Sequence, residues 1–319
     1  MPFLIGTDEA GYGPNLGPLT VTGTLWGCPN EGEDLYQSLA SIFTNQGKRD
    51  SAKKLFIADS KKVYSSSGSI AALETSVLSL VRAVTGNIPS DWQELVNMIC
   101  PDQVIEHLPN QIWLKGQQLS LPIKADVDRI QDLSDQFLAA AETASCSLIE
   151  LQCVAVFPPE FNTKIEQFGN KATLLSTETL KIVRSLMDLA DDDLEIGCDK
   201  HGGRSKYAGL IQSLLTKEFV SIGEETSDIS DYCFRENNRD VAIRFQAKGE
   251  SFLPTALASM VSKYVREIFM ILWNDFWKTY VPTIKPTKGY PLDAKRFKAE
   301  IELFQFDMGI DDHSIWRNR

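Results

Sequence analysis

The sequence contains few of the residues that form soft-metal centres or disulfide frameworks. Its 319 residues include only 6 cysteines and 3 histidines. The cysteines are scattered without a C-x-x-C pair, so we expect small buried side chains rather than zinc ligands or disulfide partners. The histidines are too few and too widely spaced for a histidine metal site.

Long apolar runs and positive charge are also scarce. No run is long enough to cross a bilayer. The segment MPFLIGTDEAGYG lacks the order of a signal peptide. The expected location is therefore the cytoplasm, with no membrane partner. The formal net charge of -11 argues against broad, non-specific binding to nucleic acid.

Cations nevertheless gather late in the sequence, where a protein that acts on a polyanion could concentrate them in a local groove. A solvated surface is the alternative interpretation. The basic residues of this segment are Lys285, Lys288, Lys295, Arg296, Lys298, Arg317 and Arg319.

Strand-like and helix-like patterns alternate along the chain and predict an α/β protein whose mixed sheet is flanked by helices. Strands are predicted for FLIGTDE, PLTVTGTLW, LFIAD, LIELQCVAVF, LEIGCD and RDVAIRFQ. Helices are predicted near 69–84, 171–189 and 254–280, and another opens in HGGRSKYAGLIQSLL. Trp273, Phe276 and Trp277 of the longest helix are expected in the core.

Carboxylates stand at the ends of two predicted strands. FLIGTDE ends in Asp8 and Glu9, and LEIGCD ends in Asp199. The segment KGES adds Glu250. Carboxylate oxygens are ligands that Mg²⁺ and Mn²⁺ prefer. The pattern therefore predicts a hard-cation site at the edge of the sheet. Acids that only cap turns and helices are the alternative.

A glycine-rich turn follows the first acid pair, in DEAGYGPNLGPL. Gly11, Gly13 and Gly17 let the backbone pass close to a ligand and present amide groups to it. Next to paired acids, this turn suggests a phosphodiester lying across a metal site. A plain tight turn between two strands is the alternative.

The block DEAGYGPNLGPL resembles the signature of type 2 ribonucleases H, the ribonuclease HII and HIII group. Further segments resemble that family in its order: IADSKKV, LEIGCD, KGESFLPTALASMVSKYVRE, PTKGYPLDAKRF and HSIWRNR. The likeness spans nearly the whole chain except 88–145. It implies a ribonuclease H-like catalytic domain over 1–270, with 88–145 as an insertion or elaboration. It also implies a C-terminal helical, basic, substrate-binding segment over 271–319.

The resemblance implies a metal-dependent endoribonuclease. Its substrate would be the RNA strand of RNA/DNA hybrids or ribonucleotides embedded in duplex DNA, and its products would be 5′-phosphate and 3′-hydroxyl ends. Asp8, Glu9, Asp199 and Glu250 match the catalytic acids, which would hold two Mg²⁺ or Mn²⁺ ions about 4 Å apart. Nucleic acid is thus the implied partner, and a monomer is favoured.

The resemblance also implies substrate contacts. The glycine-rich turn would contact the 2′-hydroxyl, which distinguishes RNA from DNA, and a tyrosine further along would pack on the sugar at the RNA–DNA junction. Two lysines are candidate partners of phosphates or carboxylates. These positions are Gly11, Tyr12, Gly13, Lys61, Lys263 and Tyr290.

Two single residues and one segment depart from the family pattern. Tyr12 stands where the family usually has Arg or Lys, and Glu250 where it usually has Asp. The segment CDKHGGRSKYAG places Arg204 and Lys206 at the start of a predicted helix, where an anion is favoured. We hypothesise that Arg204 or Lys206 supplies the phosphate contact that Tyr12 cannot.

These departures keep two alternative functions open. One is a ribonuclease H-fold protein that binds nucleic acid with weak or no cleavage. The other is a nuclease of the same fold that acts on branched or structured DNA.

Overall fold

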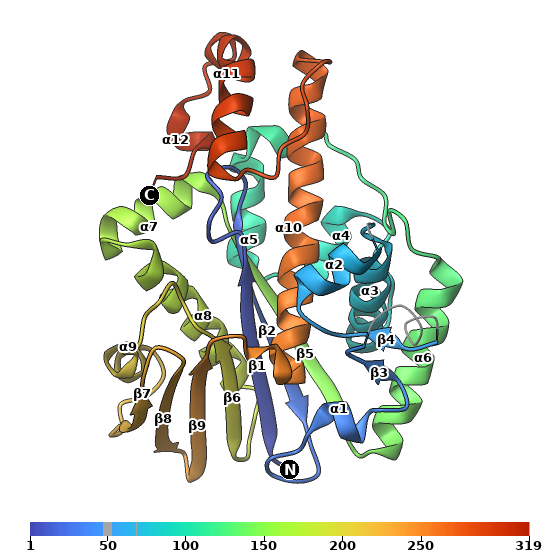
Figure 1. Ribbon diagram of the computed structural model, residues 1–319, viewed down its shortest axis with the longest axis vertical. Coiled ribbons are helices and arrows are strands. Elements are labelled where there is room, and N and C mark those ends of the chain that lie inside the picture. Colours follow the sequence, from blue (N-terminus) through green and yellow to red (C-terminus); the bar gives the residue numbers. More distant parts are fainter. Residues whose placement is uncertain (47–52, 68, 319) are drawn as a thin grey trace.

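The structure, a computed structural model, describes residues 1–46, 53–67 and 69–318, so Arg319 of the basic segment lies outside it. Seven strands form a mixed sheet in the order β5-β2-β1-β6-β9-β8-β7 (Figure 1). β1 is antiparallel to β2 and parallel to β6, and β6 is parallel to β9. The strands are β1 (Phe3–Ala10), β2 (Leu19–Gly27), β5 (Ser147–Val156), β6 (Leu194–Asp199), β7 (Ser221–Glu225), β8 (Ile229–Glu236) and β9 (Arg239–Gln246).

Helices pack on both faces of this sheet around β1 and β2, and the arrangement confirms the predicted fold class. Figure 1 shows α10, α3 and α6 on one side of β1 and α8 and α9 on the other. The helices are α1 (Leu35–Ser38), α2 (Ser60–Ser67), α3 (Ala71–Thr85), α4 (Trp92–Ile99), α5 (Asp102–His107), α6 (Val127–Thr143), α7 (Pro158–Phe168), α8 (Lys171–Met187), α9 (Ala208–Leu214), α10 (Leu253–Tyr280), α11 (Pro291–Asp307) and α12 (Asp312–Ile315). β3 (Phe43–Thr44) and β4 (Leu55–Phe56) form a separate parallel pair. β4 is shorter than the strand predicted for LFIAD.

The side chains of β1 divide the apolar interior into two cores. Leu4 packs on the α10 side, whereas Phe3 and Ile5 pack on the α8 side, as the alternation of a strand requires. The buried side of α10 includes Trp273 and Trp277, which confirms the expectation that these tryptophans are core residues. A sheet that is packed on both faces around β1 gives the carboxyl end of this strand a fixed position.

Residues 88–145 belong to the same interior. They form α4, α5 and α6 with two short 3-10 turns, and Trp113 and Phe137 from this region are buried. The buried carboxylate of Glu74 on α3 accepts hydrogen bonds of 2.7–2.8 Å from the amides of residues 123–125 and one of 2.7 Å from the hydroxyl of Tyr264. The region is therefore fastened to α3 and α10.

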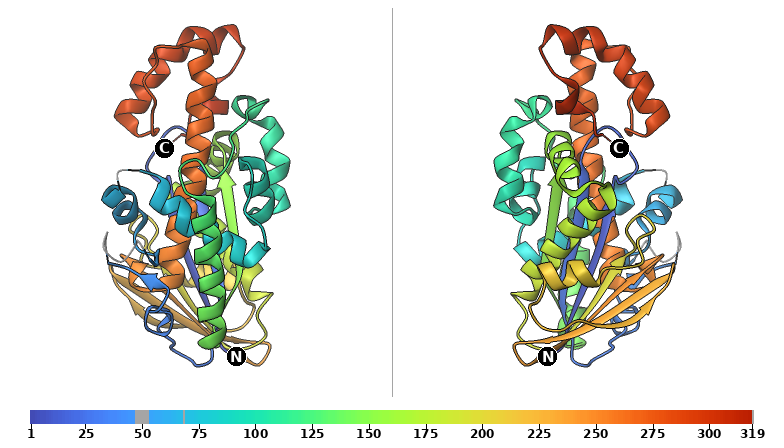
Figure 2. Two further views of the ribbon diagram at one scale, coloured as in Figure 1. Left: turned by 90° about the vertical axis from the view of Figure 1, so that its right-hand side faces the viewer. Right: turned by 90° about the vertical axis from the view of Figure 1, so that its left-hand side faces the viewer.

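The segment expected to bind substrate begins inside a helix. α10 is continuous from Leu253 to Tyr280, across the expected boundary between 270 and 271. Both views of Figure 2 show α11 beside the far end of α10, beyond the sheet. None of the described helices is both long enough and apolar enough to span a membrane.

Candidate metal and nucleic-acid site

Three carboxylates converge where β1 and β6 end. The two strands pair in register, with Gly6 opposite Gly197, so Asp8 and Asp199 follow two residues later on neighbouring strands. Glu9 is the next residue of β1. One carboxylate oxygen from each of Asp8, Glu9 and Asp199 lies within 4.8 Å of the other two.

The two glycines let α10 approach the sheet directly below the acids. A Cβ on Gly6 would lie 2.0 Å from the carbonyl carbon of Pro254, and one on Gly197 would lie 2.5 Å from the ring of Phe252. Thr255 Oγ1 donates a hydrogen bond of 2.9 Å to the carbonyl oxygen of Gly197. Glycine at both positions therefore permits the start of α10 to fix the ends of the two strands.

Burial raises the pKa of all three acids, and repulsion between carboxylates adds to the shift of Asp8 and Glu9. Burial, then the charges of Glu9 and Asp199, raise the pKa of Asp8 well above its usual range. Burial, followed by the charge of Asp199, raises the pKa of Glu9 to about 7. The pKa of Asp199 is raised by burial, although backbone amides oppose the shift. The cluster therefore repels added negative charge and favours a cation.

The donor set fits a hard divalent cation. Every ligand atom is a carboxylate oxygen, which suits Mg²⁺ or Mn²⁺. Oε2 of Glu9 is buried and accepts no hydrogen bond from the part of the chain that the structure describes. A buried carboxylate oxygen without a partner is costly unless a cation or water satisfies it.

Glu250 stands outside this three-acid group. It lies on a single 3-10 turn, Gly249–Ser251, between β9 and α10. Burial raises its pKa, and the charges of Asp59 and Asp199 contribute to the shift. Asp59, from the IADSKKV block, is an acid that we did not predict at the site. Apart from its place in that block, the sequence did not distinguish Asp59 from an ordinary helix cap. Its side chain accepts a hydrogen bond from the amide of Lys61, as a capping residue does.

The two predicted lysines have different surroundings. Lys61 is exposed, and its charge lowers the pKa of Glu9, Asp199 and Glu250 against the larger effect of burial, so it lies within electrostatic reach of the acids. Lys263 forms an ion pair with Glu267 one helical turn further along α10.

The glycine-rich turn rests on two buried arginines. Arg266 and Arg317 are 2% and 1% exposed. Gly11 has a φ of +91°, and a Cβ there would lie 2.4 Å from Nε of Arg266. Nη2 of Arg317 donates to the carbonyl oxygens of Gly11, at 2.7 Å, and Pro14. The turn is thus held from below by cations that bind its carbonyl groups.

The predicted basic groove needs a correction. Arg317 is buried beneath the turn rather than exposed to a polyanion. Arg296 pairs with Asp293 and Glu300. Lys298 pairs with Asp312. Lys298 therefore joins α11 to α12, Arg296 forms its ion pairs within α11, and Arg317 holds the turn. Lys285, Lys288 and Lys295 are exposed.

Two tyrosines of the predicted substrate surface lie at the turn. Tyr290 is 53% exposed, and its ring is 3.8 Å from where a Cβ of Gly13 would lie. Tyr12 lies under the ammonium of Lys171, which is 4.5 Å from its ring centroid. Lys171 was not among the predicted residues, because nothing in its spacing distinguishes it from other lysines on helix surfaces.

The segment after Asp199 is a loop and not the start of a helix, because α9 begins only at Ala208. Nη2 of Arg204 donates a hydrogen bond of 2.6 Å to Oγ1 of Thr173 in the first turn of α8. Lys206 is exposed. Burial, assisted by the charge of Arg204, lowers the pKa of His201 to about 3, so this buried histidine stays neutral.

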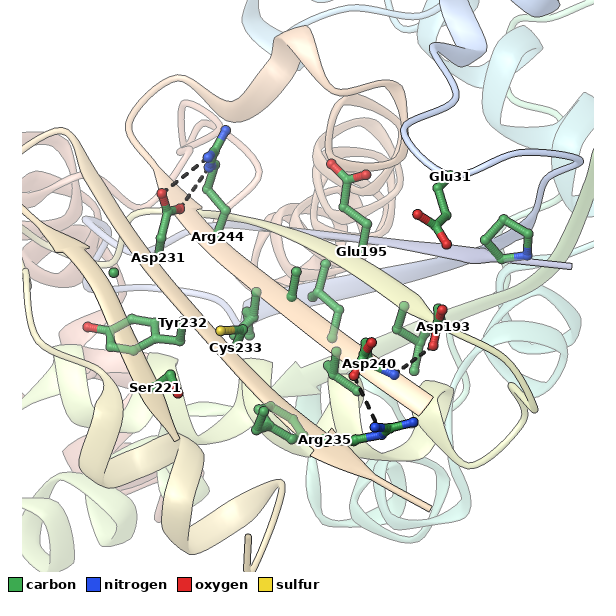
Figure 3. A pocket seen from close by; sticks show the side chains of 18 of the residues that line it. Glu31, Asp193, Glu195, Ser221, Asp231, Tyr232, Cys233, Arg235, Asp240 and Arg244 are labelled. Atoms are coloured by element: carbon green, nitrogen blue, oxygen red, sulfur yellow. Dashed lines mark hydrogen bonds and ion pairs between the residues drawn. The ribbon is translucent and has the colours of Figure 1, made fainter. Parts of the chain in front are cut away.

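A groove of about 860 Å³ lies elsewhere, on the face of β6, β9, β8 and β7 that α8 and α9 leave open (Figure 3). Arg244 points into it and pairs with Asp231 at 2.7 Å. Arg235 and Asp240 form another pair at 3.7 Å. The three clustered acids do not line this groove, whose two arginines are both paired with acids.

No protein-family model matches the chain, and no curated protein matches its sequence. Among solved structures, it is similar to ribonuclease HII of Archaeoglobus fulgidus, solved in complex with PCNA. The identity is 13%, the TM-score is 0.43, and the likeness covers 99% of this chain and 94% of that chain. For ribonuclease H2 of Pyrococcus horikoshii OT3 the identity is 15% and the TM-score is 0.42, and the likeness covers 98% of this chain and 92% of that chain. For Bst-RNase HIII in complex with Mn²⁺ the identity is 12% and the TM-score is 0.41, and the likeness covers 99% of this chain and 66% of that chain.

Proposed function

We propose that this protein is a metal-dependent endoribonuclease that cleaves RNA in RNA/DNA hybrids or ribonucleotides embedded in duplex DNA. The convergence of Asp8, Glu9 and Asp199 at the ends of two parallel strands carries the proposal. The substrate class rests on the resemblance of the sequence motifs to type 2 ribonucleases H.

Asp8, Glu9 and Asp199 would hold Mg²⁺ or Mn²⁺, with Glu250 as a fourth acid at the rim. When bound, such ions supply an activated water and stabilise the leaving 3′ oxygen. The unpartnered oxygen of Glu9 supports this assignment, because a divalent cation would satisfy it.

The remaining roles concern substrate binding. Gly11 and Gly13 would present backbone amides to the 2′-hydroxyl, and Tyr290 would pack on the sugar next to the turn. Lys61 would neutralise a phosphate beside the acids, and the C-terminal segment would bind the duplex flank. Products with 5′-phosphate and 3′-hydroxyl ends would follow if water attacked the phosphorus and the P–O3′ bond broke, so that the phosphate stays on the 5′ oxygen and the 3′ oxygen leaves as the hydroxyl.

One experiment tests this function. The protein is incubated with Mg²⁺ or Mn²⁺ and three labelled duplexes: an RNA/DNA hybrid, DNA with one embedded ribonucleotide, and all-DNA. We expect cleavage of only the first two, and no cleavage by Asp8→Asn. Binding without cleavage in either metal would favour the non-cleaving alternative, which the departures at Tyr12 and Glu250 motivate. Cleavage of branched DNA alone would favour the structured-DNA nuclease.

A further inference from the structure

Tyr12 is the meeting point of three segments that lie far apart in the sequence. It belongs to the glycine-rich turn after β1, and its ring lies beneath Lys171, the first residue of α8. The loop after β6 passes its hydroxyl so closely that a Cβ on Gly202 would lie 2.3 Å from it. Gly202 has a φ of +57°, so this passage uses both the absent side chain and the left-handed backbone of glycine.

The ring of Tyr12 gives the ammonium of Lys171 a defined position. An ammonium 4.5 Å from a ring centroid is within range of a cation–π interaction, which strengthens as the pair is desolvated. Both residues are only partly buried. The charge of Glu9 contributes to the raised pKa of Tyr12, after burial, which places this pair within electrostatic reach of the acids.

Arg204 fastens the assembly rather than contributing a separate contact. Its Nη2 donates 2.6 Å to Oγ1 of Thr173, and its Nη1 donates 3.4 Å to the carbonyl oxygen of Lys206. These hydrogen bonds tie the loop after β6 to the first turn of α8. Arg204 is therefore a positioning residue that keeps Gly202 against Tyr12 and α8 beside the turn.

We propose that Lys171, seated on the ring of Tyr12, is the cation that binds a substrate backbone phosphate at the glycine-rich turn. The proposal rests on the proposed function, because the ligand is the nucleic acid that the acids cleave. It also gives a reason for a tyrosine at position 12, where the family pattern has a cation. The ring of Tyr12 positions a lysine from another segment instead of supplying the cation itself. It also transfers to Lys171 the phosphate contact that the sequence suggested for Arg204 or Lys206.

A double-mutant cycle tests this assignment. Affinity for the RNA/DNA hybrid is measured by fluorescence anisotropy, without metal, in an Asp8→Asn background that all variants share. We expect Lys171→Ala to weaken binding roughly tenfold. The slope of log affinity against log salt should fall by about 0.9, as for one lost phosphate contact. Lys181→Ala, on the same helix and paired with Glu178, is the matched control and should bind normally.

The substitution Tyr12→Arg completes the cycle. It restores a cation on the turn, so adding Lys171→Ala to it should cost less than adding Lys171→Ala to the parent. Equal costs in both backgrounds would overturn the coupling of Lys171 to Tyr12. Unchanged affinity of Lys171→Ala while the parent binds the hybrid would overturn the phosphate contact but leave the proposed function intact. A wild-type protein that neither binds nor cleaves any of the three duplexes would overturn both.

Discussion

Asp8 and Asp199 stand level on neighbouring parallel strands, each two residues beyond one member of the facing pair Gly6 and Gly197. The two aspartates therefore project from the same face of the sheet, the face on which α10 begins. Glu9 is the next residue of β1, and one of its carboxylate oxygens still lies within 4.8 Å of one from each aspartate. The short distances between these carboxylates suit a bound cation, but the carboxylates repel one another when no cation is present. Stability measured with and without metal therefore tests the site.

Asp199→Asn should stabilise the metal-free protein and remove its response to metal. Removing one charge from a repelling cluster should raise the free energy of unfolding at pH 8 by about 1–3 kcal/mol. In the wild type, Mg²⁺ or Mn²⁺ should raise the melting temperature. In Asp199→Asn that increase should be largely lost. Thermal unfolding with and without metal measures both effects.

Asp231→Asn is the control for this comparison, because it removes an acid from the distant ion pair with Arg244. It should keep the full metal response. If metal stabilised Asp199→Asn as much as the wild type, Asp199 would not belong to the binding site.

The stability of the metal-free protein should fall with rising pH because of Glu9. Its pKa is about 7 in the folded protein against an ordinary 4.5, so the folded state holds a proton that the unfolded state releases. This contribution is fully present below about pH 4.5 and is lost as the pH rises through 7. Relative to Glu9→Gln, the wild type should therefore lose about 1–3 kcal/mol between pH 5 and pH 8. Urea unfolding of both proteins across this range provides the measurement, and a constant difference between them would refute the assignment.

Gly6→Ala should displace α10 from the sheet. The added Cβ would lie 2.0 Å from the Pro254 carbonyl carbon, a backbone atom that cannot move without shifting the helix. We expect a loss of about 1–3 kcal/mol or more in the free energy of unfolding, together with weaker metal binding. Gly209→Ala on α9 meets no atom within 4 Å and should be neutral or slightly stabilising. Equal behaviour of the two variants would show that the close approach is not needed.

Arg317→Met should loosen the glycine-rich turn. The variant keeps an unbranched side chain against Phe161, over which the guanidinium lies at 4.8 Å, but leaves the carbonyl oxygens of Gly11 and Pro14 without their donor. The free energy of opening the turn should fall by about 1–3 kcal/mol. Faster amide hydrogen exchange over residues 11–17 measures this. Arg235→Met, which removes a cation from the exposed pair with Asp240, should leave that exchange unchanged.

The strands and helices that build the interior could be predicted, because their apolar residues repeat with a clear period. β1 and β6 are short apolar runs that end in acid, and α10 has a long amphipathic pattern. β8 was missed because charged and polar residues interrupt ISDYCFRE, although Asn237 and Asn238 at positive φ form the turn that joins it to β9. α11 lies in the segment 271–319 that the resemblance implied to be helical, but its own periodicity predicted no helix, because few of its positions face the core while Leu303 and Phe306 are exposed.

Side-chain roles followed the same division. Asp8, Glu9 and Asp199 could be proposed together because strand ends that share a sheet edge bring their acids together. The burial of Arg317 could not be predicted, since its partners are backbone carbonyls some 300 positions away, at Gly11 and Pro14. The role of Lys171 could not be predicted for a similar reason, because only the packing of α8 against the turn places its ammonium over the ring of Tyr12.

The hydrogen bonds between Asn15 and Arg317 join positions 302 apart in the sequence. Both residues lie in irregular segments outside the helices and strands, and such segments open locally at a lower free energy than packed central strands do. The acids, in contrast, sit on paired central strands, which open only with the whole domain. On warming, the turn should detach from the C-terminal segment while the acids still hold their arrangement. Recognition of the substrate sugar would then have a lower thermal limit than capture of the cation.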